Sequence, residues 1–449
     1  MRKLLALWIL ALPALAAPAL AAPALADDDR VSELERKIDV LTQEIEQMKL
    51  GGAADTARYQ SRFGLGPAAS KVYGVARGVS IGGYGEMLYE NFDREREDEA
   101  PSARLDRLDF LRQVLYVGYK FSDELVFNSE IEIEHAGVRD EAAVEGEADP
   151  LTGEVQGTAE LSGEVVLEFA YLEWMRRRAI GVRAGMLLIP LGIVNEMHEP
   201  PVFVGARRPE VEQRIIPTTW RANGAGLFGE LEGGLSYRLF LTEGLDASHF
   251  TANGIRGGRQ SGSRSILTRP AVSARIDYAG LAGLVVGGSV YSGDSWQDFQ
   301  PAANNLEPRV TLVDVHGRWQ WRGLEARALF ARGSLAEAGE LSDALGLTAS
   351  SRLGESFFGF YAEAAYDVFP LWWPGSHYAF APYLRWETYD TQEDVPGGSE
   401  DPALERAVLT AGAAFRPHPN VVVKADRQWR SNEAETETSQ WNLAVGYLF

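Results

Sequence analysis

From residue 80 to the end of the chain, apolar residues alternate with polar or small residues at a period of two. The last segment is the clearest example. Its apolar face consists of Trp441, Leu443, Val445, Tyr447 and Phe449. The opposite face is small or polar up to Leu448. A strand with these two faces fits a wall that has lipid on one side and water on the other.

Sixteen segments with this alternation follow one another along the chain. They cover approximately 80–90, 105–121, 125–134, 162–176, 179–190, 221–233, 234–244, 270–280, 283–294, 308–322, 324–334, 353–370, 376–390, 403–416, 420–431 and 438–449. An even number of strands is what a single-chain bacterial barrel needs when both of its termini lie on the same side.

The connections between these segments alternate between short and long. The short connections include 122–124, 232–234, 279–280, 322–323 and 417–420. The long connections include 91–104, 136–161, 191–220, 245–269, 295–307, 335–352 and 391–402. A barrel with tight turns at one end and long loops at the other produces this pattern, and a soluble β-sandwich does not. We therefore predict an all-β fold, a 16-stranded antiparallel transmembrane β-barrel over residues 80–449.

Three further segments precede the predicted barrel. Residues 1–26 have a basic start, a short apolar run and the sequence Ala24-Leu25-Ala26, which together predict a signal peptide. Residues 27–50 predict a periplasmic coiled-coil helix, because apolar residues recur at spacings of three and four. The seam consists of Val31, Leu34, Ile38, Leu41, Ile45 and Met48. A dimeric coil, a trimeric coil and a helix lying against the barrel all remain open. Residues 51–79 are rich in glycine and alanine, and we predict a linker there.

Composition excludes several classes of function. The formal net charge is −21, which disfavours binding to nucleic acid. The chain has no cysteine, so disulfides cannot stabilise it. His198-Glu199 lacks the spacing of a zinc motif, and no serine lies in a recognisable nucleophile motif. We predict no metal, no cofactor and no enzymatic activity.

Charged residues on the predicted strands indicate a polar interior. In the third segment, Glu130, Glu132 and Glu134 alternate with apolar residues. A charge facing lipid costs several kilocalories per mole, so we expect these glutamates to face a water-filled lumen. The other predicted lumen-facing residues are Arg183, Arg318, Arg385, Lys424 and Arg430. Because both signs are present, these residues predict a polar channel rather than a filter for a single anion.

The connection 190–220 is the strongest candidate for a pore constriction. It contains five prolines and several apolar residues, so we expect it to be ordered and to fold into the barrel. The candidate basic side is Arg207, Arg208 and Arg214. The candidate acidic side is Glu196, Glu199, Glu210 and Glu212. An equally open alternative is that these charges pair within the loop and hold its shape. In the next loop, Arg256, Arg259 and Arg264 either attract anions at the mouth or bind solvent and acidic loops.

Several stretches resemble one known family. They are RAGMLLIPLG (183–192), NEMHEPP (195–201), RRPEVEQRIIPTTW (207–220) and GIRGGRQ (254–260). Together with the coiled coil and Phe449, they resemble the phosphate-selective porin O/P-like family of bacterial outer-membrane porins. The resemblance implies a trimeric sixteen-stranded channel whose third loop folds inward. The arginine ladder of its phosphate-specific members has no match in this chain. The end of the chain, with Tyr447 and Phe449, resembles the signal read by the barrel-assembly machinery.

The predicted function is passive diffusion of small hydrophilic solutes and ions through a water-filled channel in the bacterial outer membrane. Anions such as phosphate are candidate solutes. The expected partners are two further copies of the chain in a homotrimer, outer-membrane lipid, lipopolysaccharide and the barrel-assembly machinery. The alternatives are a barrel that tethers the cell envelope through residues 27–50 and, less favoured, an outer-membrane hydrolase.

Overall fold

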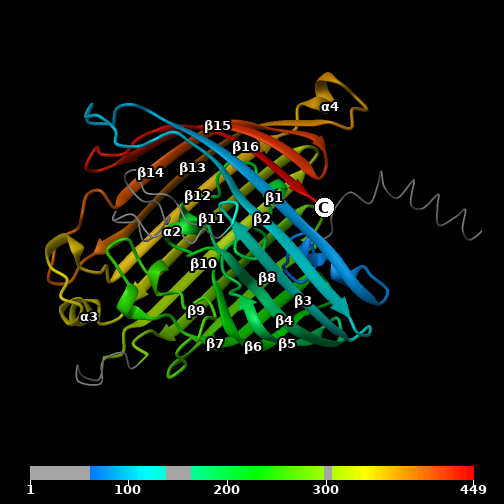
Figure 1. Ribbon diagram of the computed structural model, residues 1–449, viewed down its shortest axis with the longest axis horizontal. Helices are drawn as coiled ribbons and strands as arrows, with labels where there is room; N and C mark the ends of the chain where they lie inside the picture. Colours follow the sequence, from blue (N-terminus) through cyan, green and yellow to red (C-terminus); the bar gives the residue numbers. More distant parts are fainter. Residues whose placement is uncertain (1–60, 138–162, 298–305) are drawn as a thin grey trace, which may run out of the picture. The chain divides into compact units, whose positions relative to one another are not determined.

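The computed structural model describes residues 61–137, 163–297 and 306–449. These residues form a closed barrel in which each strand pairs antiparallel with its neighbours in the chain, and β1 pairs with β16 (Figure 1). The prediction of a sixteen-stranded antiparallel barrel is confirmed. The predicted signal peptide, the predicted coiled-coil helix and residues 51–60 of the predicted linker lie outside the described residues.

The observed strands overlap the predicted segments throughout. They are β1 (Gly78–Phe92), β2 (Arg107–Lys120), β3 (Leu125–Glu134), β4 (Val165–Arg177), β5 (Ile180–Leu188), β6 (Arg221–Glu230), β7 (Leu235–Glu243), β8 (Pro270–Leu281), β9 (Leu284–Asp294), β10 (Arg309–Trp321), β11 (Leu324–Leu335), β12 (Ser356–Tyr366), β13 (Ala379–Asp394), β14 (Glu405–His418), β15 (Val421–Asn432) and β16 (Gln440–Leu448).

Short helices lie in the connections and before β1. They are η1 (Ala69–Tyr73), η2 (Pro200–Val202), α2 (Val211–Arg214), η3 (Ala247–His249), η4 (Arg256–Gly258), α3 (Ala338–Ala344), η5 (Ala349–Ser351) and α4 (Phe369–Trp372). Among the described residues, none of the helices has both the length and the apolar character needed to cross a bilayer.

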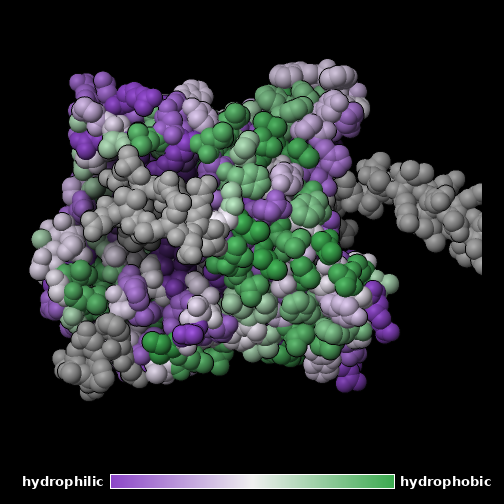
Figure 2. Space-filling model, in the orientation of Figure 1, coloured by the Kyte–Doolittle hydropathy of each residue, from purple (hydrophilic) through white to green (hydrophobic). Residues whose placement is uncertain are grey.

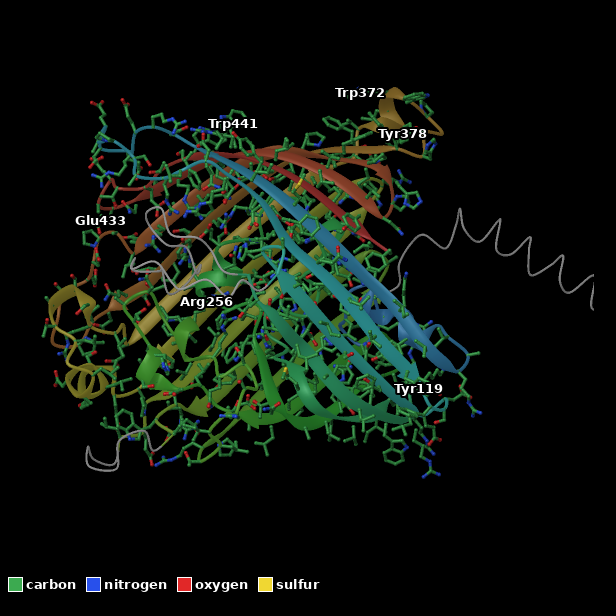
Figure 3. All side chains as sticks on the ribbon, viewed as in Figure 1. Tyr119, Arg256, Trp372, Tyr378, Glu433 and Trp441 are labelled. Atoms are coloured by element: carbon green, nitrogen blue, oxygen red, sulfur yellow. The ribbon has the colours of Figure 1, made fainter. Side chains whose placement is uncertain are left out.

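Short and long connections alternate around the barrel, as the sequence predicts. We call the end with the short connections, such as 178–179 and 322–323, the turn end. The opposite end, with connections such as 189–220 and 244–269, is the loop end. Figure 3 labels Tyr119 at the turn end and Glu433 at the loop end.

One connection at the turn end is longer than predicted. The predicted segments 353–370 and 376–390 leave only a short turn between them, but β12 ends at Tyr366, β13 begins at Ala379 and the connection contains α4. The reason is local, because the Asp367 carboxylate accepts hydrogen bonds from the backbone N–H groups of Phe369 (3.2 Å) and Phe380 (3.1 Å). The carboxylate thus joins the two ends of the connection around α4. Trp372 is 70% exposed and lies at the tip of this connection (Figure 3).

The two faces of each strand have different environments. On β16, Trp441 and Leu443 are 55% and 47% exposed, whereas the alternating residues Asn442 and Ala444 are buried. Figure 2 shows hydrophobic side chains as a broad area over the strands and hydrophilic side chains gathered toward the loop end. The apolar side of the alternation therefore faces outward.

The structure revises the prediction of a linker for residues 61–74, which we call the inner segment. They pack inside the barrel, where Phe63, Leu65 and Val72 are buried in one cluster with Tyr116 and Phe169 of the wall. The sequence reading failed here because a short 3-10 helix has no amphipathic repeat that a periodicity search would detect.

The barrel closes where aromatic rings of the last strand lie over glycines of the first. Gly83 and Phe449 exchange backbone hydrogen bonds of 3.0 and 2.9 Å. A Cβ on Gly83 would lie 2.5 Å from the Phe449 ring, and one on Gly85 would lie 2.3 Å from the Tyr447 hydroxyl oxygen. The glycines therefore make room for the terminal aromatic rings. The last of the sixteen predicted segments, 438–449, therefore pairs with the first, 80–90, and closes the barrel.

We expect Gly83→Ala to impair barrel closure, because the added methyl group would collide with both the Val114 carbonyl oxygen and the Phe449 ring. Removal of Phe449 should have the same effect. The matched control is Gly317→Ala in β10, whose Cβ would have its nearest neighbour 3.7 Å away. Heat-modifiability on gels measures the folded fraction. Equal folded fractions for the position 83 and position 317 variants would contradict this account of closure.

Candidate pore site

The pore loop, residues 190–220, lies inside the barrel, where cations of the wall hold its carbonyl groups. The Lys424 ammonium donates hydrogen bonds of 2.7 Å to the carbonyl oxygens of Pro200 and Gly205. Arg385 donates to the carbonyl of Arg207 at 3.1 Å. Further donors of the same kind are Arg275 to Gly192, Arg327 to Val202 and Arg416 to Pro201. These cations come from five strands between β8 and β15.

Carboxylates of the same wall hold the amide groups of the loop. Asp426 accepts from the Ala206 N–H at 2.7 Å. Glu387 accepts from the Glu210 N–H at 2.6 Å, and Asp314 from Gly192 at 3.1 Å. An irregular backbone inside a barrel needs partners for its peptide groups, since an unpaired buried group is costly. The charges of the wall supply those partners.

The predicted acidic side of the constriction is buried within this framework. Glu196 forms an ion pair with Arg238 at 3.2 Å. The Glu199 carboxylate accepts from the backbone N–H groups of Ala68 and Ala69 at 2.9 to 3.1 Å. Burial raises the pKa of Glu199 to about 8. Glu196 is therefore bound to the barrel wall, and Glu199 is bound to the backbone of residues 68 and 69.

Glu210 and Glu212 are likewise buried. Arg430 donates to Glu210 at 2.8 Å. Burial opposes ionisation of Glu210, but Arg430 and Arg214 outweigh it and hold its pKa well below the usual range. Glu212 accepts from the Val194 N–H and the Tyr361 hydroxyl, both at 2.6 Å. Burial raises the pKa of Glu212 to about 7, and these donors limit the rise.

The three arginines of the predicted basic side have different kinds of partner. Arg207 pairs with Glu90 of β1, and Arg214 lies 3.5 Å from Glu210. Arg208 donates to the His198 carbonyl at 3.3 Å and to the Thr219 hydroxyl at 3.4 Å. Much of the loop charge thus holds the shape of the loop, which is the alternative that the sequence left open.

A cavity of about 550 Å³ lies between the pore loop and the β1–β2 wall. The loop contributes Arg207, Arg208, Gln213 and the threonines 218 and 219. The wall contributes Glu86, Glu90, Arg107, Asp109, Arg112, Glu134 and His135, and Glu164 lies just before β4. Of the seven predicted constriction residues, this cavity is lined by Arg207 and Arg208 alone among the described residues.

Arg256 and Arg259 also line the cavity, and the sequence did not place them there. Arg259 donates to the carbonyls of Pro217 and Thr219, and Arg256 donates to that of Thr218. Burial lowers the pKa of Arg259 to about 10, so the side chain remains charged at neutral pH. Arg256 lies within the outline of the barrel in Figure 3. The GIRGGRQ stretch was the available signal, but nothing in it reveals that it packs on the preceding loop.

The eight predicted lumen-facing residues lie on the inner side of their strands, but most do not face open water. Glu130 accepts from or donates to the His198 ring at 2.9 Å, and Arg112 donates to Glu132 at 2.9 Å. Arg183 pairs with Glu173 at 2.9 Å. Of the remaining five, Glu134 lines the cavity and Arg318 is half-buried on β10. The other three donate hydrogen bonds from the wall to the pore loop: Arg385, Lys424 and Arg430. Glu130 and Glu132 were expected to face a water-filled lumen, but both are buried, and the pore loop lies against Glu130 through His198.

One serine, histidine and aspartate meet in the loop after β7. The Ser248 hydroxyl lies 3.1 Å from His249 Nδ1, and Asp246 lies 3.4 Å from the same nitrogen. A hydrolytic triad needs the serine and the acid on opposite ring nitrogens. Ser248 instead donates to Asp246 at 2.6 Å, which is a local turn contact.

Comparison with known proteins identifies one clear relative. An uncharacterized protein of Aquifex aeolicus (strain VF5) is 37% identical over 402 residues, which cover 87% of this chain and 84% of that protein. The chain belongs to the same family as this Aquifex protein. No family model matches the chain.

Solved structures share the fold. OmpF of Salmonella typhi, in complex with daunomycin, aligns with a TM-score of 0.50 at 14% identity, covering 83% of this chain and 98% of OmpF. The outer-membrane channel DcaP of Acinetobacter baumannii aligns with a TM-score of 0.49 at 11% identity, covering 83% and 97%. The fold is thus that of bacterial outer-membrane porins.

We expect Lys424→Met to loosen the pore loop, because two buried carbonyls would lose their donor. The loss of these charged hydrogen bonds should lower the free energy of unfolding by about 3 kcal/mol. Arg427→Met is the control, since Arg427 lies on the outer face of the same strand and pairs with Asp93. Thermal unfolding in detergent tests this, and an unchanged melting temperature for the Lys424 variant would contradict it.

Stability should fall as pH rises from 6.5 to 8.5. The pKa values of Glu199 (about 8) and Glu212 (about 7) lie above the ordinary value of 4.5, so the folded state binds more protons than the unfolded state. That stabilisation is complete below 4.5 and is lost as pH rises through the folded values. Burial lowers the pKa of His198 to about 3. This residue therefore makes the protein more stable as pH rises, but only at pH values below its ordinary pKa of 6.5.

The expected loss over this range is about 2 kcal/mol. Melting temperatures of the wild type and of Glu212→Gln, measured at pH 6.5, 7.5 and 8.5, provide the test. The variant should show a shallower decline because it lacks one of the two titrating groups. A wild-type melting temperature that rises with pH would show that these carboxyl groups do not control stability.

Proposed function

We propose that this protein is a porin of the bacterial outer membrane that lets small hydrophilic solutes and ions diffuse passively. The observation that carries the proposal is the charged cavity of about 550 Å³ between an inward-folded loop and the wall of a closed barrel. An apolar outer face and a polar interior are what a barrel with lipid outside and water inside requires. The porin-like fold supports the same reading.

We further propose that the channel prefers anions. Most of the carboxylates of the cavity already have a cation within reach, since Glu90 pairs with Arg207 and Asp109 with His135. By contrast, Arg208 and Arg259 donate to hydroxyl and carbonyl oxygens. Glu134, Glu164 and Glu168 act on Arg259 only from beyond hydrogen-bond distance, and Glu130 and Glu132 act in the same way on Arg208. A desolvated wall whose positive charge is only partly balanced concentrates anions. Phosphate is one candidate among small anions.

The cellular setting is part of the proposal. Export through the signal peptide 1–26, recognition of Tyr447 and Phe449 by the barrel-assembly machinery, and assembly as a homotrimer among outer-membrane lipid and lipopolysaccharide all remain predictions. The coiled-coil helix 27–50 would then lie in the periplasm. The exposed aromatic residues at the turn end, such as Trp319 and Trp321, support placement at a membrane–water interface.

Purified protein in a planar bilayer should show discrete conductance steps, and its reversal potential in a salt gradient should indicate an anion preference. Arg208→Gln should lower the anion-to-cation permeability ratio about twofold, because one positive charge is removed from the cavity. Arg332→Gln, on the outer face of β11 beside Glu393, is the control and should leave the ratio unchanged. A cation preference in the wild type would overturn the anion assignment but not the channel.

A further inference from the structure

The inner segment lies between the cavity and the turn end of the barrel. Along β1, the cavity is lined by Glu86 and Glu90, whereas Gly82, nearer the turn end, contacts Ala68 and Lys71 of the inner segment. The same order holds on β2, where Arg107 and Arg112 line the cavity and Gly118 packs against Val72. A solute that leaves the cavity along this wall therefore meets residues 61–74.

Three side-chain contacts hold the inner segment in place. Glu199 of the pore loop accepts from the backbone N–H groups of Ala68 and Ala69, at the start of η1. Asn128 of β3 donates to the Ala69 carbonyl at 3.0 Å. At the other end of η1, the Tyr73 hydroxyl donates to Glu173 of β4 at 2.9 Å. The segment is thus attached both to the wall and to the pore loop.

The inner segment is not part of the barrel ladder. All sixteen strand pairings, including the closing pair of β1 with β16, are formed by residues from Gly78 onward. The ring is therefore complete without residues 61–74. Glycines show where the fit is tightest, because a Cβ on Gly66 would lie 2.4 Å from the Glu199 carboxylate and one on Gly64 would lie 2.7 Å from the Arg238 guanidinium. The segment also packs its buried side chains Phe63, Leu65 and Val72 against the wall, and its Gly66 N–H donates to the Glu196 carbonyl at 3.3 Å. All of these contacts lie outside the strand ladder, so they can break without opening a strand pair.

We propose that residues 61–74 are a gate of the channel, closed in this structure and seated on Glu199 of the pore loop. The inference rests on the proposed channel function and adds its regulation. When the segment is seated, it blocks the way from the cavity to the turn end along β1–β3. When it leaves, that path opens while the barrel stays closed. The contrasting possibility is that the inner segment is a permanent part of the wall and that solutes pass elsewhere.

A reversible disulfide provides the test, because the chain has no cysteine to interfere. A Cβ at position 118 would lie 2.8 Å from the Val72 Cβ, so cysteines at these two positions reach one another after a small shift. The variant Val72→Cys/Gly118→Cys should conduct like the wild type when reduced. When oxidised, it should open at least about tenfold less often. Each single-cysteine variant, treated with the same oxidant, is the control.

A second variant tests the contact between Glu199 and the inner segment. Measured above pH 8, where Glu199 is ionised, Glu199→Gln keeps the shape of the side chain but replaces one acceptor of the Ala68 and Ala69 amides with a donor. It should raise the fraction of time that the channel is open. Glu433→Gln, at an exposed position of the loop end, is the matched control (Figure 3). Gel heat-modifiability confirms that both variants are folded before conductance is measured.

The outcomes separate the gate from the channel. If the oxidised double-cysteine variant conducts as well as the reduced one, with the crosslink verified by mass spectrometry, residues 61–74 are not a gate and the channel function stands. If folded wild type, reduced double-cysteine variant and Glu199→Gln all fail to conduct, the proposed channel function itself is wrong. Loss of openings on oxidation that returns on reduction supports both.

Discussion

The interior of this barrel depends on hydrogen bonds between charged side chains of the wall and peptide groups of the pore loop. Lys424 binds two loop carbonyls, while Asp426 and Glu387 bind loop amides. A backbone without regular secondary structure is stable in a buried place only when its polar groups find partners. Because the partners are charged, each bond is stronger than one between neutral groups, and the loop is held in a single conformation. The cavity and the seat of the inner segment both follow from that conformation.

The same arrangement explains how so many charges are tolerated out of water. An isolated buried charge is very costly, but a buried charge with an opposite partner and several hydrogen bonds is not. Arg385 lies against Glu387 at 2.9 Å and also holds the Arg207 carbonyl. Such pairs contribute mainly to a unique geometry, since a well-packed apolar pair would often be equally stable. In a channel, geometry determines what can pass.

The strands were predictable because a two-residue period determines which side each residue faces, and lipid on one side makes that period strong. The inward fold of the pore loop was predictable from its prolines and apolar residues. The partners of its charges were not. Glu199 binds amides 131 residues earlier in the chain, and Glu210 binds Arg430, 220 residues later. Such pairings follow from barrel closure, and no local pattern encodes them. The inner segment was missed because its short 3-10 helix has no amphipathic repeat.

The pairing of the last strand with the first sets an order for assembly. The edge of β1 has no partner until β16 arrives, and the two lie at opposite ends of the barrel sequence. An exposed strand edge invites pairing with other chains, so it must be shielded during that interval. The inner segment does not share this constraint, because it lies outside the strand ladder and the turn end of the barrel gives it access after closure. The final seam is therefore the step at which the chain is most exposed to pairing with other chains, whereas residues 61–74 can take their place later.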